Sequence, residues 1–148
     1  MCYNVRVSNV GRILGVDFGT KRVGLAVCDD NRTVATPLPV FYTRSMRMTI
    51  DHVAELCGRY GINCVVVGLP LNLDGADSVQ TGRVRAFARN VERVTKLPVE
   101  LYDERLSTVE ADELLIEAGV RRAADRAKLV DSMSAKVILQ GYLDNKNK

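Results

Sequence analysis

The order of the short apolar runs constrains the fold of this 148-residue chain more than any other feature. The first three runs, Arg12–Val16, Val23–Cys28 and Val34–Val40, are separated only by turns, which is typical of strands joined as hairpins. The later runs, Cys64–Val67 and Val99–Tyr102, alternate with longer segments of helical spacing. This order predicts one α/β domain with a mixed five-stranded sheet and flanking helices.

The segments between and after the later runs have helical spacing and plausible end signals. We expect four helices, at Met46–Tyr60, Ser78–Val94, Ser107–Gly119 and Asp125–Leu143. Gly61 is a plausible stop for the first helix, and the prolines at 37 and 39 favour an edge position for the third strand. The domain should therefore span residues 12–143, with extensions at 1–11 and 144–148 and fraying over Lys146–Lys148.

Acidic residues stand directly after two of the apolar runs, where the predicted strands end. Asp17 follows the first run, and Asp103 and Glu104 follow the last. Asp131 lies in the C-terminal helix. Asp is depleted in strands and rarely buried unpaired, so carboxylates at these places favour a site for a hard cation such as Mg²⁺. Neighbours in an extended segment point to opposite faces, so only one of Asp103 and Glu104 should join Asp17, and we favour Glu104.

Basic residues adjoin these carboxylates. Lys21 and Arg22 follow Asp17 closely, Arg105 follows Glu104, and a cluster flanks the last helix at Arg121, Arg122, Arg126 and Lys128. A helical stripe also recurs every four residues, at Arg85, Arg89 and Arg93. The net charge of +3 is a mild bias, so the distribution carries the argument. Basic side chains near a carboxylate site suit a polyanion backbone, although such stripes can also be solvated helix faces.

Several classes of chemistry are disfavoured by what the sequence lacks. His52 is the only histidine and falls on a predicted exposed helix face, which argues against Ser–His and Cys–His catalysis. The four cysteines form no metal-binding or disulfide pattern, and we expect Cys28 and Cys64 to be core residues in a reducing, cytoplasmic compartment. We expect no signal peptide and no membrane-spanning segment.

Four motifs in this order resemble those of the YqgF/RuvX family. They are the stretch from Gly15 to Asp29, the segment from Val66 to Pro70 with Asp74-Gly75, the segment from Asp103 to Thr108, and the segment from Lys128 to Leu143. The resemblance implies an RNase H-like fold and a metal-dependent nuclease. It also implies that Asp17, Asp131 and one of Asp103 and Glu104 bind one or two Mg²⁺ or Mn²⁺ ions.

Members of that family are described as nucleases that mature the precursor of small-subunit ribosomal RNA and as Holliday junction resolvases. The resemblance therefore favours structured RNA as the substrate, pre-16S rRNA above all, with branched DNA as the alternative. Two further hypotheses stay open. The chain could be a non-catalytic factor that binds nucleic acid or the ribosome. It could also be a nucleotide-binding switch, because the turn from Asp17 to Thr20 resembles a phosphate motif of actin-like ATPases. The oligomeric state is not predicted.

Overall fold

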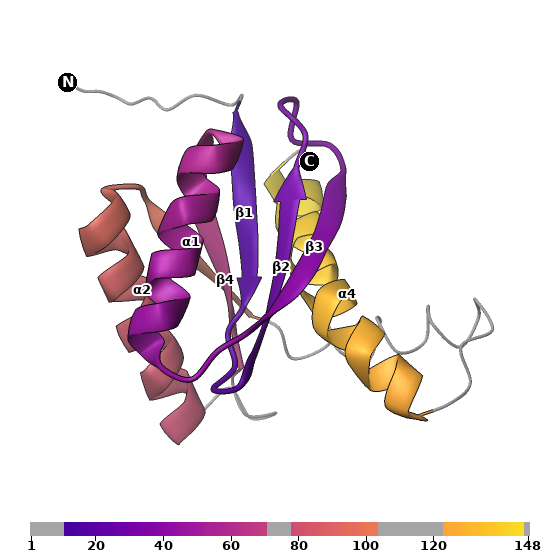
Figure 1. Ribbon diagram of the computed structural model, residues 1–148. Coiled ribbons are helices and arrows are strands. Elements are labelled where there is room, and N and C mark those ends of the chain that lie inside the picture. Colours follow the sequence, from indigo (N-terminus) through magenta and orange to yellow (C-terminus); the bar gives the residue numbers. More distant parts are fainter. Residues whose placement is uncertain (1–10, 71–77, 104–122, 147–148) are drawn as a thin grey trace.

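The computed structural model describes residues 11–70, 78–103 and 123–146, with only the backbone described over 123–132. Five strands form one sheet in the order β3-β2-β1-β4-β5, with helices on both faces (Figure 1). The strands are β1 (Arg12–Asp17), β2 (Arg22–Cys28), β3 (Ala35–Tyr42), β4 (Ile62–Leu69) and β5 (Val99–Asp103). The described helices are α1 (Met46–Tyr60), α2 (Val79–Thr95) and α4 (Ala123–Lys146).

The sheet is mixed, as the order of the apolar runs predicts. β1 pairs antiparallel with β2, and β2 pairs antiparallel with β3. β4 pairs parallel with β1 on one side and with β5 on the other. Pro37 and Pro39 lie within β3 without ending it, because β3 is an edge strand and one row of its N–H groups needs no ladder partner.

Local signals place α1 at its predicted bounds. The Ser45 side chain accepts a hydrogen bond from the backbone N–H of Met48 and caps the first turn. Gly61 adopts the left-handed conformation, with φ of 63°, and its N–H donates to the carbonyl of Cys57. The cap and the stop together explain why this helix begins and ends where the sequence predicts.

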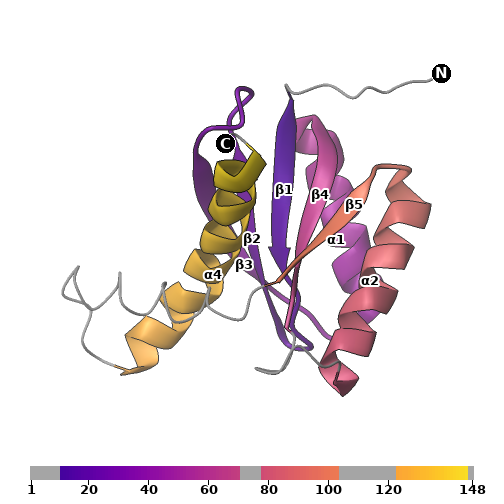
Figure 2. The ribbon, with the colours of Figure 1, turned by 180° about the vertical axis from the view of Figure 1, so that it is seen from behind.

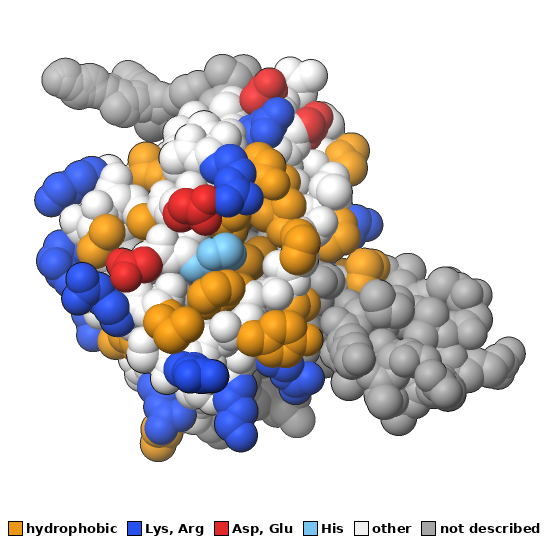
Figure 3. Space-filling model, in the orientation of Figure 1, with side chains coloured by type: hydrophobic (Ala, Val, Ile, Leu, Met, Phe, Trp, Pro, Cys, Tyr) orange, Lys and Arg blue, Asp and Glu red, His pale blue; other side chains and the backbone are white. Residues whose placement is uncertain are grey.

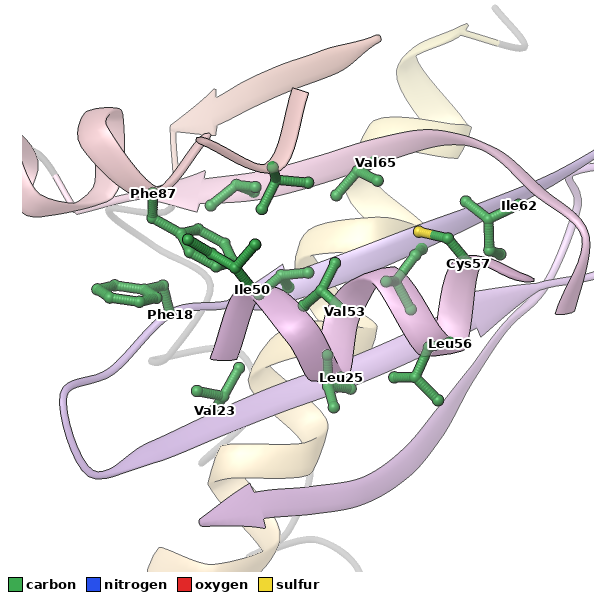
Figure 4. Packing of buried hydrophobic residues seen from close by; sticks show 14 of the residues in the cluster. Phe18, Val23, Leu25, Ile50, Val53, Leu56, Cys57, Ile62, Val65 and Phe87 are labelled. Carbon is green, nitrogen blue, oxygen red and sulfur yellow. The ribbon is translucent and has the colours of Figure 1, made fainter. Parts of the chain in front are cut away.

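Two hydrophobic cores lie on opposite faces of the sheet because side chains alternate along each strand. Leu14 and Val16 of β1 belong to the first core, which α1 and α2 cover (Figure 4). Ile13 of β1 belongs to the second core, where α4 supplies Ile138 and Leu139. Figure 2 shows α4 on this face of the sheet. Each strand of the sheet centre is therefore buried on both sides, as expected for its nearly continuous apolar sequence.

Four expectations differ from the structure or fall outside its described part. α4 continues through Lys146, beyond the predicted end of the last helix at Leu143. His52 is half-buried rather than exposed, because its ring stacks on Phe41 of β3 with centroids 4.0 Å apart. The helix predicted over Ser107–Gly119 and the extension at 1–10 lie outside the described residues. None of the described helices has the length and apolar character that crossing a bilayer requires.

Candidate active site

The predicted strand-end carboxylates lie at one edge of the sheet. β1, β4 and β5 run parallel, so Asp17 and Asp103 end their strands at the same edge. Val16 pairs with Val67, and Leu69 pairs with Asp103, which places Asp103 one residue beyond the level of Asp17. Because β4 separates the two strands, their backbones lie about 10 Å apart.

The two aspartates belong to opposite faces of the sheet. Ile13 packs in the α4 core and Gly15 approaches Leu139 of α4, so Asp17, two residues further, falls on the α4 face. On β5, Val99 packs against the α1/α2 core and Tyr102 against the α4 core. Asp103 therefore falls on the α1/α2 face, away from Asp17. Glu104, the favoured alternative, lies outside the described residues.

The backbone of α4 brings residue 131 toward Asp17. A Cβ built on Gly15 would lie 2.8 Å from Leu139 Cβ and 3.3 Å from the Ala135 carbonyl oxygen, so only glycine permits this approach of β1 and α4. Position 131 precedes Ala135 by one helical turn and lies on the same side of the helix. The beginning of α4 lies at the sheet end where β1 finishes (Figures 1 and 2). Residue 131 is therefore displaced from Ala135 toward the level of Asp17.

Asp17 opens onto a pocket of about 540 Å³ formed by the β1–β2 turn and the end of β3. The aspartate is half-buried, whereas Lys21 and Arg22 are exposed at the rim. The lining residues are Asp17, Phe18, Gly19, Thr20, Lys21, Arg22 and Tyr42. A carboxylate with two neighbouring cations in such a hollow can receive a phosphate group and a hard cation together.

Three features hold this turn in place. A Cβ on Gly19 would lie 2.3 Å from the carbonyl oxygen of Arg22, so the turn closes only with glycine there. Phe18 points into the core and stacks on Phe87 of α2, with ring centroids 4.5 Å apart (Figure 4). The backbone N–H of Thr43 also donates to the carbonyl of Lys21 over 2.9 Å. The position of Asp17 therefore depends on α2 and on Thr43, the residue that follows β3.

The described cysteines are unsuited to nucleophilic catalysis. Burial raises the pKa of Cys57 and Cys64 to about 11, and burial also raises the pKa of Cys28. These three buried thiols are protonated at neutral pH, which confirms the prediction that Cys28 and Cys64 are core residues. Burial lowers the pKa of His52, whose ring packs away from the Asp17 pocket.

The described residues include only part of the predicted site. Within the described residues no three His, Cys, Asp or Glu side chains are grouped to hold a metal ion. Asp17, Lys21 and Arg22 lie together, as predicted from their spacing. Arg105, Arg121 and Arg122 lie outside the described residues, as do the side chains of Asp131 and Lys128.

Tyr42 is a pocket residue that sequence reasoning missed. The sequence predicts that the third strand ends at Val40, whereas β3 continues two residues further to Tyr42. Charge is also unevenly spread on the face shown in Figure 3. Lys and Arg side chains gather along the lower edge of this face and over α2. Along the lower edge, no described Asp or Glu side chain is visible. The exposed Arg89 and Arg93 of the predicted stripe belong to α2.

Sequence comparison finds relatives over nearly the whole chain. A family model described as "RuvX: Holliday junction resolvase" matches residues 11–145. A protein of Ruegeria sp. (strain TM1040) with the name "Putative pre-16S rRNA nuclease" is 42% identical over 132 residues, which cover 89% of this chain and 83% of that protein. A protein of the same name from Anaeromyxobacter sp. (strain Fw109-5) is 43% identical over 136 residues, covering 92% of this chain and 98% of the relative.

Structural comparison finds the same architecture in solved resolvases. RuvC of T. thermophilus, in complex with a Holliday junction substrate, superposes with a TM-score of 0.58 at 17% identity, covering 92% of this chain and 95% of that one. The Fowlpox virus resolvase in complex with Holliday junction DNA gives a TM-score of 0.60 at 14% identity, covering 93% and 99%. At these identities the similarity shows the fold, and it confirms the predicted RNase H-like class.

Proposed function

This chain belongs to the RuvX family, and from that premise we propose that it is a metal-dependent nuclease that hydrolyses phosphodiester bonds at the Asp17 pocket. One observation above all supports the location of the catalytic site at the Asp17 pocket. A half-buried carboxylate ends a central strand inside a pocket whose rim carries Lys21 and Arg22. A metal-dependent nuclease needs this combination, because it must hold a cation for catalysis and bind the phosphates on either side of the scissile bond.

Oxygen donors of carboxylates suit Mg²⁺ or Mn²⁺, so the residue types at this sheet edge fit such a metal. We propose that Asp17, Glu104 and Asp131 hold one or two ions, which would activate a water and stabilise the leaving oxygen. Residue 131 is a ligand candidate because α4 carries it toward Asp17 on the same face. We prefer Glu104 over Asp103 because alternation along β5 puts Asp103 on the opposite face from Asp17.

Basic side chains would hold the substrate backbone without reading bases. Lys21 and Arg22 are positioned for the phosphates nearest Asp17, since they line the same pocket. We propose further phosphate contacts by Arg105, Arg121, Arg122 and Lys128. The basic lower edge in Figure 3 supports a polyanion as the ligand, because long-range attraction raises the rate of encounter with nucleic acid.

We propose the 5′ end of pre-16S rRNA as the substrate, within the precursor of the small ribosomal subunit. Relatives at 42–43% identity have the name "Putative pre-16S rRNA nuclease". A resolvase activity on branched DNA is the second candidate, because the family model is described by it. Residues 12–143 would act as one nuclease domain. The free, buried thiols of Cys28, Cys57 and Cys64 support a reducing, cytoplasmic location.

Substitution of Asp17 tests this proposal. The purified protein should cleave precursor RNA with Mg²⁺ or Mn²⁺, and Asp17→Asn should abolish cleavage because it removes the charge that holds the cation while keeping the side chain's shape. Its free energy of unfolding without metal should stay equal or rise, since clustered carboxylates repel one another. Asp30→Asn is the matched control, because the Asp30 side chain is 78% exposed and lies at the opposite end of the sheet. At that end, the backbone N–H of Gly11 donates a hydrogen bond to the carbonyl of Asp30.

The same assays separate the candidate functions. Faster cleavage of four-way DNA junctions than of precursor RNA would favour the resolvase. RNA binding without calorimetrically detectable Mg²⁺ or Mn²⁺ binding would favour a non-catalytic factor. Full activity of Asp17→Asn would refute the proposed site.

A further inference from the structure

Tyr42 presents an aromatic ring to solvent beside the Asp17 pocket. The residue ends β3, lines the pocket and is 63% exposed. Its neighbour Phe41 packs against the α1/α2 core, so alternation turns Tyr42 to the α4 face. Large aromatic side chains bury most of their surface in folded proteins. An aromatic ring left this open at the rim of a pocket is therefore available to a ligand.

Strand register places Tyr42 in line with the basic rim and with Asp17. Tyr42 pairs directly with Arg22 across β2 and β3, and directly opposed residues have Cβ atoms about 4.5–5.5 Å apart. Gly24, two residues after Arg22, pairs with Asp17 on β1. The three side chains of Asp17, Arg22 and Tyr42 therefore belong to one face. Two strand spacings and two residues of rise put the Asp17 and Tyr42 backbones about 12 Å apart.

We propose that Tyr42 stacks on an unpaired nucleobase of the substrate strand, a few nucleotides from the scissile bond, while Arg22 binds a phosphate between them. This inference rests on the proposed nuclease function and specifies the substrate class of that site. The bases of a continuous duplex are already stacked on each other, whereas an unpaired base offers a free π-face. Any base can stack, so the preference concerns strandedness and not sequence. Of the two candidate substrates, this preference for unpaired bases favours RNA with single-stranded segments.

Binding assays in EDTA test the stacking without involving cleavage. Fluorescence anisotropy would give the affinities of a single-stranded RNA and of a fully paired duplex containing the same sequence. Tyr42→Ala should weaken single-strand binding by about 5- to 150-fold, the equivalent of one lost stacked base, and duplex binding by less than about 2-fold. Tyr42→Phe should stay within about 2-fold of wild type, because the ring is kept. Val34→Ala, which trims an apolar side chain that is 55% exposed near the other end of β3, should change neither affinity.

Salt dependence distinguishes stacking from a phosphate contact. Tyr42→Ala should leave the log–log slope of affinity against salt unchanged, whereas Lys21→Ala should lower it by about 0.7 for a single strand. A 2-aminopurine probe moved along the single strand should be quenched at a defined position, and Tyr42→Ala should abolish that quenching. These readouts respond to ring–base contact and not to stability, which thermal unfolding of each variant would monitor.

Equal losses on single strand and duplex, or no loss with Tyr42→Ala, would overturn the stacking proposal. A wild-type protein that binds no RNA would overturn it as well. Failure of the nuclease proposal looks different. If the wild type cleaves nothing, or Asp17→Asn cleaves fully, a Tyr42-dependent preference for unpaired RNA in EDTA would still stand, because that measurement needs neither metal nor hydrolysis.

Discussion

Replacing Gly15 with alanine should both destabilise the protein and impair catalysis. The added Cβ would lie 2.8 Å from Leu139 Cβ and 3.3 Å from the Ala135 carbonyl oxygen. Neither atom is the end of a flexible side chain, so β1 and α4 must separate. A shift of about 0.6 Å brings the Cβ pair to the 3.4 Å at which ordinary contact begins. Overpacking of this kind costs about 1–3 kcal/mol.

Stability and activity should fall together in Gly15→Ala because α4 also carries residue 131. Urea titration should show a free energy of unfolding lower by about 1–3 kcal/mol. Under the proposed mechanism the same shift moves residue 131 away from Asp17. Misplacement of catalytic groups by about 1 Å can cost about 100-fold in rate, so kcat on precursor RNA should fall by about 10- to 100-fold.

Gly58→Ala is the matched control. A Cβ on Gly58, within α1, meets nothing within 4 Å. The same chemical change should there raise stability by up to about 1 kcal/mol through helix propensity and leave kcat unchanged. Wild-type stability of Gly15→Ala would show that β1 and α4 are not in close contact. A destabilised Gly15→Ala with unchanged kcat would show that the spacing of β1 and α4 does not set the catalytic geometry.

Two further predictions concern the turn after β2 and the support of Asp17. Hydrogen bonds from the backbone of Val34 and from Thr33 lower the pKa of Asp29 to about 2. A depressed pKa stabilises the fold above the unfolded value of about 3.9, and this stabilisation is lost as pH falls through the folded value of about 2. Urea titrations should therefore show a stability deficit of Asp29→Asn that is constant above about pH 5 and shrinks steadily as pH falls toward and through 2. A deficit as large near pH 2 as above about pH 5 would contradict the role of the charge. Phe87→Ala removes a fully buried ring and should cost about 3–5 kcal/mol, against less than about 0.5 kcal/mol for the exposed Val94→Ala, by thermal or urea unfolding; equal costs would contradict the packing of the Asp17 turn on α2.

Local patterns predicted most of the secondary structure because they depend only on neighbouring residues. The apolar period and the glycine at position 61 define α1 at Met46–Tyr60, as observed. The five strands fall within two residues of their predicted ends. His52 shows the limit of this reasoning. The helical pattern predicts an exposed side chain at this position, but Phe41 of β3 covers the His52 ring. No local pattern encodes a contact between a helix and a strand.

The features of the candidate site can be separated in the same way into those that local sequence predicts and those that depend on tertiary contacts. The sequence by itself determined that Asp17 ends a strand beside Lys21 and Arg22, because these residues are joined by a short turn. It also predicted that Asp103 and Glu104 would point to opposite faces if both were extended, because side chains alternate along a strand. Only the tertiary structure decided which faces Asp17 and Asp103 take, and that Tyr42 joins the Asp17 pocket. Those outcomes depend on strand order and register, which are set by packing between segments far apart in the chain.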